Sequence, residues 1–374
     1  MMADEELKTV ADAVSPGALA AAAAADAVKA KSFSTLGKWA ATFIDEPPEP
    51  MRVLLARNVT GKGSETVAEH DAAWMPAGVL GLLASPGGKG KTALLLHLAG
   101  HVAAGAQWCG LEVVEPGAVA LVVGEEDLHE CHRRLRRVWD QMPSDARRKA
   151  AARTLVLPLA GTGDNRLVNE DPVSRTVTKS TRAEELITYL TGMAPEGGWS
   201  LVVVDPLSRF AGMNAETDNA SATSTMTVLE ELTKLPGKPS VLVAHHTKKR
   251  GKDDGGADLV ELIRGSSAIK DAVRWAVLLE AEAPDDAGKG RAVLRIVKSN
   301  RTSTAYAVEL VTQYGIPESG KARSVRDLDA EADERKAGEA AEAKKRAEEA
   351  KKTPGRTAAG AKANERRIID SGNV

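Results

Sequence analysis

Residues 85–92, SPGGKGKT, place glycines, a lysine and a hydroxyl between two apolar runs. The run at 78–84, GVLGLLA, predicts a strand, and residues 91–105 predict a helix. A phosphate held at such a turn needs converging backbone N–H groups and the positive field of a helix N-terminus, and glycines let the backbone come close. A lysine can reach phosphate oxygens, and a threonine hydroxyl can hold Mg²⁺. The stretch therefore predicts a phosphate-binding turn.

The turn departs at one point from the pattern G-x-x-x-x-G-K-[ST], because Ser85 stands where the first glycine belongs. We expect the prolyl and glycyl residues that follow Ser85 to supply the turn instead. The alternative is an ordinary glycine-rich connection between a strand and a helix. We predict nucleotide contacts from these residues: Ser85, Pro86, Gly87, Gly88, Lys89, Gly90, Lys91, Thr92 and Ala93.

Two further apolar runs end in carboxylates. WSLVVVD, at 199–205, ends in Asp205, which fits a carboxylate that orients Mg²⁺ together with Thr92. GAVALVVGEED, at 117–127, places Glu125 and Glu126 after a strand. Hydrolysis needs a carboxylate that orients and polarises the attacking water, and either glutamate could do this. The alternative is that both are surface acids at the N-cap of the next helix.

A fourth element, SVLVAHHTKKRGKDDGG, joins a strand to a basic, glycine-rich stretch. His245 and His246 are adjacent and so point to opposite faces of the strand, and we expect at most one to reach the nucleotide. The stretch after them is typical of a loop that contacts a polyanion, and its alternative is a plain solvated loop.

The segments that position these residues alternate between strands and helices. Strands are predicted at 78–84, 118–124, 154–160, 201–205, 240–246, 276–281 and 293–298, and helices at 91–105, 127–141, 182–193 and 221–235. The continuous apolar strands favour an α/β fold with a mainly parallel twisted sheet flanked by helices. The last strands are closer together in sequence and predict an antiparallel extension.

Composition divides the chain into three parts. Residues 1–69 are predicted to be an alanine-rich, weakly packed arm, 70–315 the α/β domain, and 316–374 a charged tail that is helical or disordered. The chain has 374 residues and a formal net charge of −2, so any DNA contact must come from local basic patches. Its two cysteines lack metal-ligand spacing and are predicted to be buried. Without a long apolar run or a basic leader, we expect a cytoplasmic protein, encoded by a bacterium, plasmid or phage, with no membrane partner.

The four elements in this order resemble RecA-like P-loop ATPases, specifically the RepA-type hexameric replicative helicases and their AAA_25-like relatives, over roughly residues 70–315. The resemblance implies ATP and Mg²⁺ as cofactors, with Lys91 and Thr92 binding ATP–Mg²⁺ and Asp205 completing the metal site. It points to Glu125 as the catalytic glutamate, with Glu126 as the alternative, and to His246 as the γ-phosphate sensor.

The resemblance also implies residues that act between subunits and on DNA. Arg274, in DAVRW, matches the arginine that such helicases insert into the neighbouring subunit's site, and Lys298 and Arg301 are rival cations for that role. In this fold, loops after Asp205 and His246 line a central channel. The predicted DNA contacts are Arg209, Lys248, Lys249, Arg250 and Lys252.

Three functions fit this pattern. The first is an ATP-dependent helicase or translocase on single-stranded DNA, which forms a homo-oligomeric, hexameric ring and works with a loader or primase in replication. The second is a RecA-like recombination or repair ATPase that coats DNA as a filament. The third is an ATP-switched regulatory or assembly protein, for which the charged tail would bind a partner.

Overall fold

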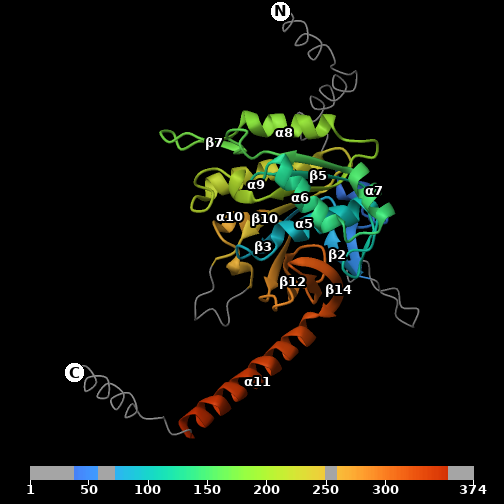
Figure 1. Ribbon diagram of the computed structural model, residues 1–374. Coiled ribbons are helices and arrows are strands. Elements are labelled where there is room, and N and C mark those ends of the chain that lie inside the picture. Colours follow the sequence, from blue (N-terminus) through green and yellow to red (C-terminus); the bar gives the residue numbers. More distant parts are fainter. Residues whose placement is uncertain (1–37, 58–71, 249–258, 353–374) are drawn as a thin grey trace, which may run out of the picture. The chain divides into compact units, whose positions relative to one another are not determined.

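The apolar runs of the sequence build one large sheet. In the computed structural model, which describes residues 38–57, 72–248 and 259–352, nine strands lie in the order β14-β13-β12-β11-β3-β10-β9-β5-β6 (Figure 1). They span Leu80–Ser85 (β3), Ala118–Val123 (β5), Thr154–Pro158 (β6), Trp199–Asp205 (β9), Ser240–His246 (β10), Trp275–Ala281 (β11), Lys289–Ser299 (β12), Tyr306–Gln313 (β13) and Ile316–Ser324 (β14).

The sheet has a parallel part and an antiparallel part. The six strands from β11 through β3, β10, β9 and β5 to β6 pair in parallel. The strands β12, β13 and β14 extend the sheet from β11 as an antiparallel meander. Both predictions for the sheet, its mainly parallel centre and its antiparallel extension, are therefore confirmed.

Register brings the chemistry-bearing strand ends to one edge of the sheet. In the pairing of β3 with β10, Ser85 lies opposite His246. In the pairing of β5 with β9, Val123 lies opposite Asp205, so the glutamates that follow β5 start beside that aspartate. Carboxyl ends of parallel strands share an edge, which is where open α/β sheets bind ligands.

Helices cover both faces of the sheet (Figure 1). They span Lys91–Ala104 (α5), Leu128–Trp139 (α6), Ser144–Ala152 (α7), Thr181–Gly192 (α8), Asn219–Glu231 (α9) and Ser267–Ala272 (α10), with short 3₁₀ turns at Ala40–Thr42, Leu207–Arg209 (η2), Leu232–Lys234 and Leu259–Leu262. Buried side chains of α5, α6 and α7 join one apolar cluster, and those of α8, α9 and α10 join the other.

The alternation of side chains along the strands explains the two clusters. In β3, Leu83 packs with the α5 side, whereas Leu82 and Ala84 pack with the α9 side. Strands covered on both faces have no polar face, which is why their sequences are apolar throughout.

The structured core begins and ends outside the limits predicted from composition. A small antiparallel sheet, in the order β2-β1-β4, contains Val53–Arg57 (β1), Ala73–Pro76 (β2) and Leu111–Val113 (β4). Leu54 and Leu55 of β1 are fully buried, so this part of the predicted arm is packed.

Strand β14 pairs with β13 over eight residue pairs, so Ile316–Ser324 belongs to the sheet and not to the charged tail. A two-stranded hairpin is formed by Val168–Glu170 (β7) and Val177–Lys179 (β8).

The chain separates into two units, Met1–Ser324 and Val325–Val374. In the second unit, Val325–Lys352 forms helix α11, and Arg346 pairs with Glu342 one turn earlier at 3.6 Å. Such i,i+4 pairs support a helix that has few large apolar residues. Among the described helices, none combines the length and the apolar character needed to span a bilayer.

Candidate functional site

The glycine-rich turn between β3 and α5 is shaped to receive an anion. Gly88 and Gly90 adopt φ angles of 71° and 82°, a region that favours glycine. A side chain added at Gly87 or Gly88 would meet no heavy atom within 4 Å, so both face open space. Gly90 is the N-cap of α5 and supplies no side-chain cap, which leaves the first N–H groups of the helix for a ligand.

Lys91 lies folded over this turn. Its Nζ donates to the carbonyl oxygens of Ser85 and Pro86, both at 3.1 Å, and lies 3.2 Å from Ser85 Oγ. Burial lowers the pKa of Lys91, while the carboxylates of Asp205 and Glu125 act in the opposite direction. Ser85, which replaces the first glycine of the usual pattern, is fully buried in an extended strand, and its hydroxyl donates to the Pro86 carbonyl.

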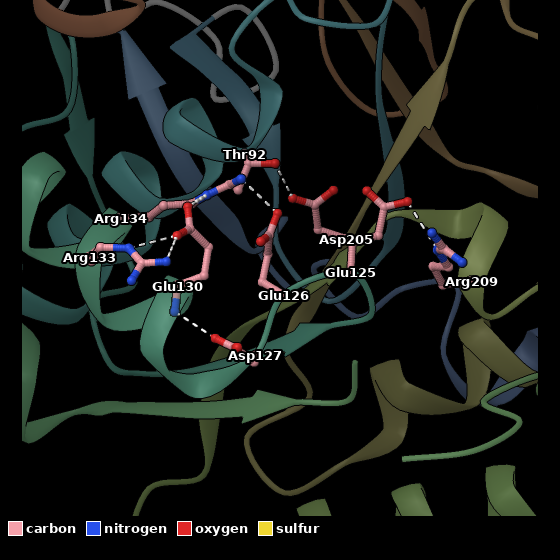
Figure 2. A network of polar contacts seen from close by, with 9 residues as sticks. All are labelled: Thr92, Glu125, Glu126, Asp127, Glu130, Arg133, Arg134, Asp205 and Arg209. Carbon is pink, nitrogen blue, oxygen red and sulfur yellow. Dashed lines mark hydrogen bonds and ion pairs between the residues drawn. The ribbon is translucent and has the colours of Figure 1, made fainter. Parts of the chain in front are cut away.

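Thr92 and Asp205 come together as a pair of oxygen ligands. Thr92 Oγ1 donates to Asp205 Oδ2 at 2.7 Å, although the two residues are 113 positions apart in sequence (Figure 2). Asp205 is only 7% exposed, and burial raises its pKa while the Thr92 hydrogen bond and Lys91 oppose the rise.

This donor set fits Mg²⁺. No group of three or more His, Cys, Asp or Glu side chains within the described residues forms a metal cage. Magnesium in nucleotide sites typically takes one or two oxygens from the protein and the remainder from phosphates and water. A hydroxyl and a carboxylate beside an anion-binding turn provide that arrangement.

The two glutamates after β5 lie at the edge of the same cleft. The N-cap of α6 is Asp127, whose side chain accepts from the Glu130 N–H at 2.8 Å. Neither Glu125 nor Glu126 caps the helix. The alternative interpretation of the sequence, in which both glutamates act at the N-cap, is therefore wrong. Glu126 pairs with Arg134 at 2.7 Å, and Glu125 pairs with Arg209 at 3.0 Å (Figure 2).

The two histidines at the end of β10 face opposite ways, as strand geometry requires. His245 is buried, and its Nε2 donates to the Arg264 carbonyl at 2.8 Å. His246 lines the cleft and places Nδ1 3.4 Å from Lys91 Nζ. Burial and the charge of Lys91 both lower the pKa of His246, so its neutral form is favoured.

One cleft of about 650 Å³, a volume ordinary for a small-molecule site, is lined by Lys91, Thr92, Glu125, Glu126, Asp205 and His246. Of the predicted nucleotide contacts, Ser85, Pro86 and Gly87 do not line it. Sequence reasoning missed part of its wall. Helix α6 contributes Arg133, Arg134 and Arg137, the turn after β13 contributes Tyr314, and the first residue of β14 contributes Ile316. The run HRRLRRV, four residues after GEED, was a signal for the arginines, because the helix that follows β5 starts at the cleft.

The three candidate cations for the subunit interface lie elsewhere. Arg274 is exposed directly before β11 and is not among the residues that line the cleft. Lys298 donates to the carbonyls of Lys270 and Asp271 at the end of α10, at 2.7 and 3.1 Å. Arg301 is exposed in the turn after β12.

The predicted DNA contacts are divided between described and undescribed residues. Arg209 ends the 3₁₀ turn η2 after Asp205, and Lys248 follows β10 and is exposed. Lys249, Arg250 and Lys252 fall outside the described residues.

A comparison with protein families agrees with this geometry. The AAA_25 family, described as an AAA domain, matches residues 20–252, which is more than half of the chain. The matched region contains the glycine-rich turn, both glutamates after β5, Asp205 and His246. Members of such a family are P-loop ATPases, which use a nucleotide and usually Mg²⁺. From the match and the cleft together, we conclude that this chain belongs to the AAA_25 family.

Proposed function

We propose that this protein is an ATP-dependent helicase or translocase that acts on single-stranded DNA as a ring of identical subunits. The observation that carries the proposal is that three strands end at the same edge of the sheet. The carboxyl ends of β5, β9 and β10 bring Glu125, Asp205 and His246 into one cleft. Arg209 lies four residues after the end of β9, and Lys248 lies two residues after the end of β10. Residues for hydrolysis and cations for a polyanion therefore start within a few residues of one another.

In the proposed reaction, ATP–Mg²⁺ supplies the phosphoryl group and the cation that neutralises its charge. Lys91 leaves the carbonyls of the turn and binds phosphate oxygens, because a charged phosphate is a better partner for an ammonium than a peptide carbonyl. Thr92 and Asp205 hold the metal ion. Glu125 orients the attacking water and polarises it.

His246 links the cleft to the segment that follows β10. Its Nδ1 accepts from Lys91 Nζ, so a phosphate that takes Lys91 also changes the partner of the imidazole. His246 is followed immediately by Thr247 and Lys248, and the Thr247 N–H donates to the Ser85 carbonyl at 3.1 Å. A nucleotide-dependent change at His246 would therefore move the backbone that leads to the basic residues at 248–252.

Arg274 supports the assignment of a ring. Arg274 does not line the cleft of its own subunit, and its side chain makes no hydrogen bond or ion pair with another residue in the described part of the chain. Its backbone is fixed, since its N–H donates to Leu80 of the P-loop strand and its carbonyl accepts from Asn300. An arginine with a fixed backbone and no side-chain partner within its own subunit can bind the γ-phosphate in the cleft of the neighbouring subunit.

The test mixes two inactive variants. We expect Arg274→Ala to lower DNA-stimulated ATP hydrolysis by about 10³-fold, the effect of a missing arginine finger, and Lys91→Ala to abolish hydrolysis. An equimolar mixture should recover roughly a quarter of the wild-type rate, because in randomly mixed symmetric rings about a quarter of the interfaces join an intact cleft to an intact arginine.

Arg301→Ala, which removes the rival exposed arginine of the neighbouring turn, separates the two candidates. It should keep the wild-type rate. A mixture of Arg274→Ala and Lys91→Ala that stays inactive, or an Arg274→Ala variant with full activity, contradicts the role of Arg274 between subunits. Electron microscopy with ATP and DNA should show closed rings, and open filaments would contradict the ring.

A further inference from the structure

The carboxylate of Glu125 is engaged by an arginine from a different segment of the chain. Arg209 Nε donates to Glu125 Oε1 at 3.0 Å, and Figure 2 shows the two side chains extended toward each other at the edge of the network. Within the described residues this is the only hydrogen bond or ion pair of either side chain. The side chains are 57% and 44% exposed, so the pair is open to solvent and can exchange partners.

Glu126 is held differently, although it is the next residue. Its partner Arg134 is on α6, and Arg134 is itself fixed by Glu130 of the same helix at 2.8 Å. The side chain of Glu126 is only 20% exposed. Glu125 and Glu126 both line the cleft, but their partners differ. Arg134, the partner of Glu126, also lines the cleft, whereas Arg209, the partner of Glu125, lies outside it.

The backbones beneath the Arg209–Glu125 pair are fixed. The Gly124 N–H donates to the Asp205 carbonyl at 2.8 Å, which ties the end of β5 to the end of β9. A Cβ at Gly124 would lie 2.7 Å from Arg209 Cβ, so the two chain segments already touch. Leu207 and Phe210, on either side of Arg209, are buried. The parts of this contact that can move are therefore the two exposed side chains, Arg209 and Glu125.

We propose that Arg209 is a positioning residue that withholds Glu125 from the attacking water until a phosphate of single-stranded DNA takes the guanidinium. This inference rests on the proposed function and adds the way in which DNA raises turnover. A phosphate diester offers the guanidinium two oxygens in the geometry it prefers, and so competes with a single exposed carboxylate contact. When Arg209 turns to the DNA, Glu125 loses its partner and becomes available to the cleft.

Turnover without DNA is the first measurement. Arg209→Gln should raise the basal kcat for ATP by about threefold to fivefold and leave KM unchanged, because Arg209 does not line the cleft. A fivefold rise corresponds to about 1 kcal/mol, the upper range for an exposed ion pair. Arg209→Lys keeps the charge and should retain the low basal rate. DNA should stimulate Arg209→Gln less than the wild type, since its Glu125 is already released.

Arg264→Gln is the matched control for loss of an exposed arginine. Arg264 pairs with Glu216 at 2.7 Å, and these side chains are 53% and 42% exposed, close to the values for Arg209 and Glu125. Arg264→Gln should leave the basal rate at the wild-type value. Thermal unfolding of each variant confirms that the compared proteins are folded.

DNA binding without nucleotide is the second measurement, and it does not depend on hydrolysis. Glu125→Gln frees Arg209 and should tighten binding of a fluorescent oligothymidylate by about threefold. Glu126→Gln removes the same charge from the adjacent residue without freeing Arg209, and should leave the affinity unchanged. In an Arg209→Gln background, Glu125→Gln should no longer have an effect.

The outcomes separate this inference from the proposed function. A wild-type protein whose hydrolysis does not respond to DNA contradicts the proposed function. A wild type that responds, combined with an Arg209→Gln variant whose basal rate is unchanged or lower, overturns the inference alone. Equal tightening by Glu125→Gln and Glu126→Gln overturns it as well, because the effect would then come from net charge.

Discussion

Adjacent residues at the end of β5 have different surroundings and so different expected roles. Burial raises the pKa of Glu126, and the Arg134 guanidinium opposes the rise. A carboxylate fixed by an arginine of the cleft wall is suited to shaping the cleft, whereas the more exposed Glu125 is free to act once Arg209 leaves it.

We therefore expect Glu125→Gln to lower kcat by about 10²- to 10⁴-fold, the usual contribution of a general base, with little change in nucleotide affinity. Glu126→Gln should retain measurable turnover. Single-turnover hydrolysis and the binding of a fluorescent ATP analogue separate the two effects. If Glu126→Gln is the variant that abolishes turnover, the roles of the two glutamates are reversed.

A second residue-scale prediction concerns acid stability. His97, on α5, accepts a hydrogen bond at Nδ1 from Trp108 Nε1 at 3.0 Å, which requires an unprotonated nitrogen. Burial, with a smaller contribution from His101, lowers the pKa of His97 to about 3. Between this value and the ordinary pKa near 6.5 the unfolded chain binds a proton that the folded chain does not, so stability falls as the pH drops below 6.5, by up to about 1.4 kcal/mol per unit.

His97→Asn keeps an acceptor for Trp108 without a group that titrates in this range. Its free energy of unfolding, measured by urea denaturation from pH 7 to pH 4.5, should depend less on pH than that of the wild type. His129→Asn, at an exposed position of α6, is the control for losing a histidine. Parallel curves for wild type and His97→Asn would show that His97 does not cause the acid sensitivity.

At the scale of elements, helix α5 links the cleft to the core. Its N-terminus follows the glycine-rich turn at the cleft, and its buried face packs against α6. The contact is close at Gly100, where an added Cβ would lie 2.6 Å from Trp139 Nε1 and 3.0 Å from Met142 Sδ. The Trp139 indole cannot move freely, because it donates to the Leu96 carbonyl at 2.9 Å.

Gly100→Ala should destabilise the protein, since overpacking costs about 1–3 kcal/mol and exceeds the helix propensity of about 1 kcal/mol that alanine gains over glycine. Gly192→Ala, in the last turn of α8, is the matched control, because nothing lies within 4 Å of its added Cβ. Chemical denaturation compares the two variants. A Gly100→Ala variant as stable as Gly192→Ala would contradict the close packing of α5 on α6.

At the scale of the whole molecule, the sequence predicted the fold class and the residues of the site better than it predicted where the folded core begins and ends. The apolar runs before Ser85 and Asp205 are continuous because both faces of β3 and β9 are covered, and this is visible in sequence. Strand β1 escaped prediction because only five residues in an alanine- and proline-rich stretch carry it, and its burial depends on pairing with β2 and β4. Composition does not reveal such long-range pairing.

The partners of the site residues also could not be predicted. That Arg209 would meet Glu125 depends on β5 and β9 being neighbours in the sheet, although the two residues are 84 positions apart. Strand order follows from how the helices pack on the sheet and not from any local pattern. The sequence identified the residue types, and tertiary structure determined which of them meet.

The most direct test of the central claim is ATP hydrolysis with Mg²⁺, measured with and without single-stranded DNA for the wild type and Lys91→Ala. We expect the wild type to hydrolyse ATP and to do so faster with DNA, and Lys91→Ala to lose at least about 10²-fold in turnover in both conditions, as when a preorganised cation is removed from a developing charge. Hydrolysis that is independent of DNA, or a Lys91→Ala variant that keeps the wild-type rate, would contradict the account.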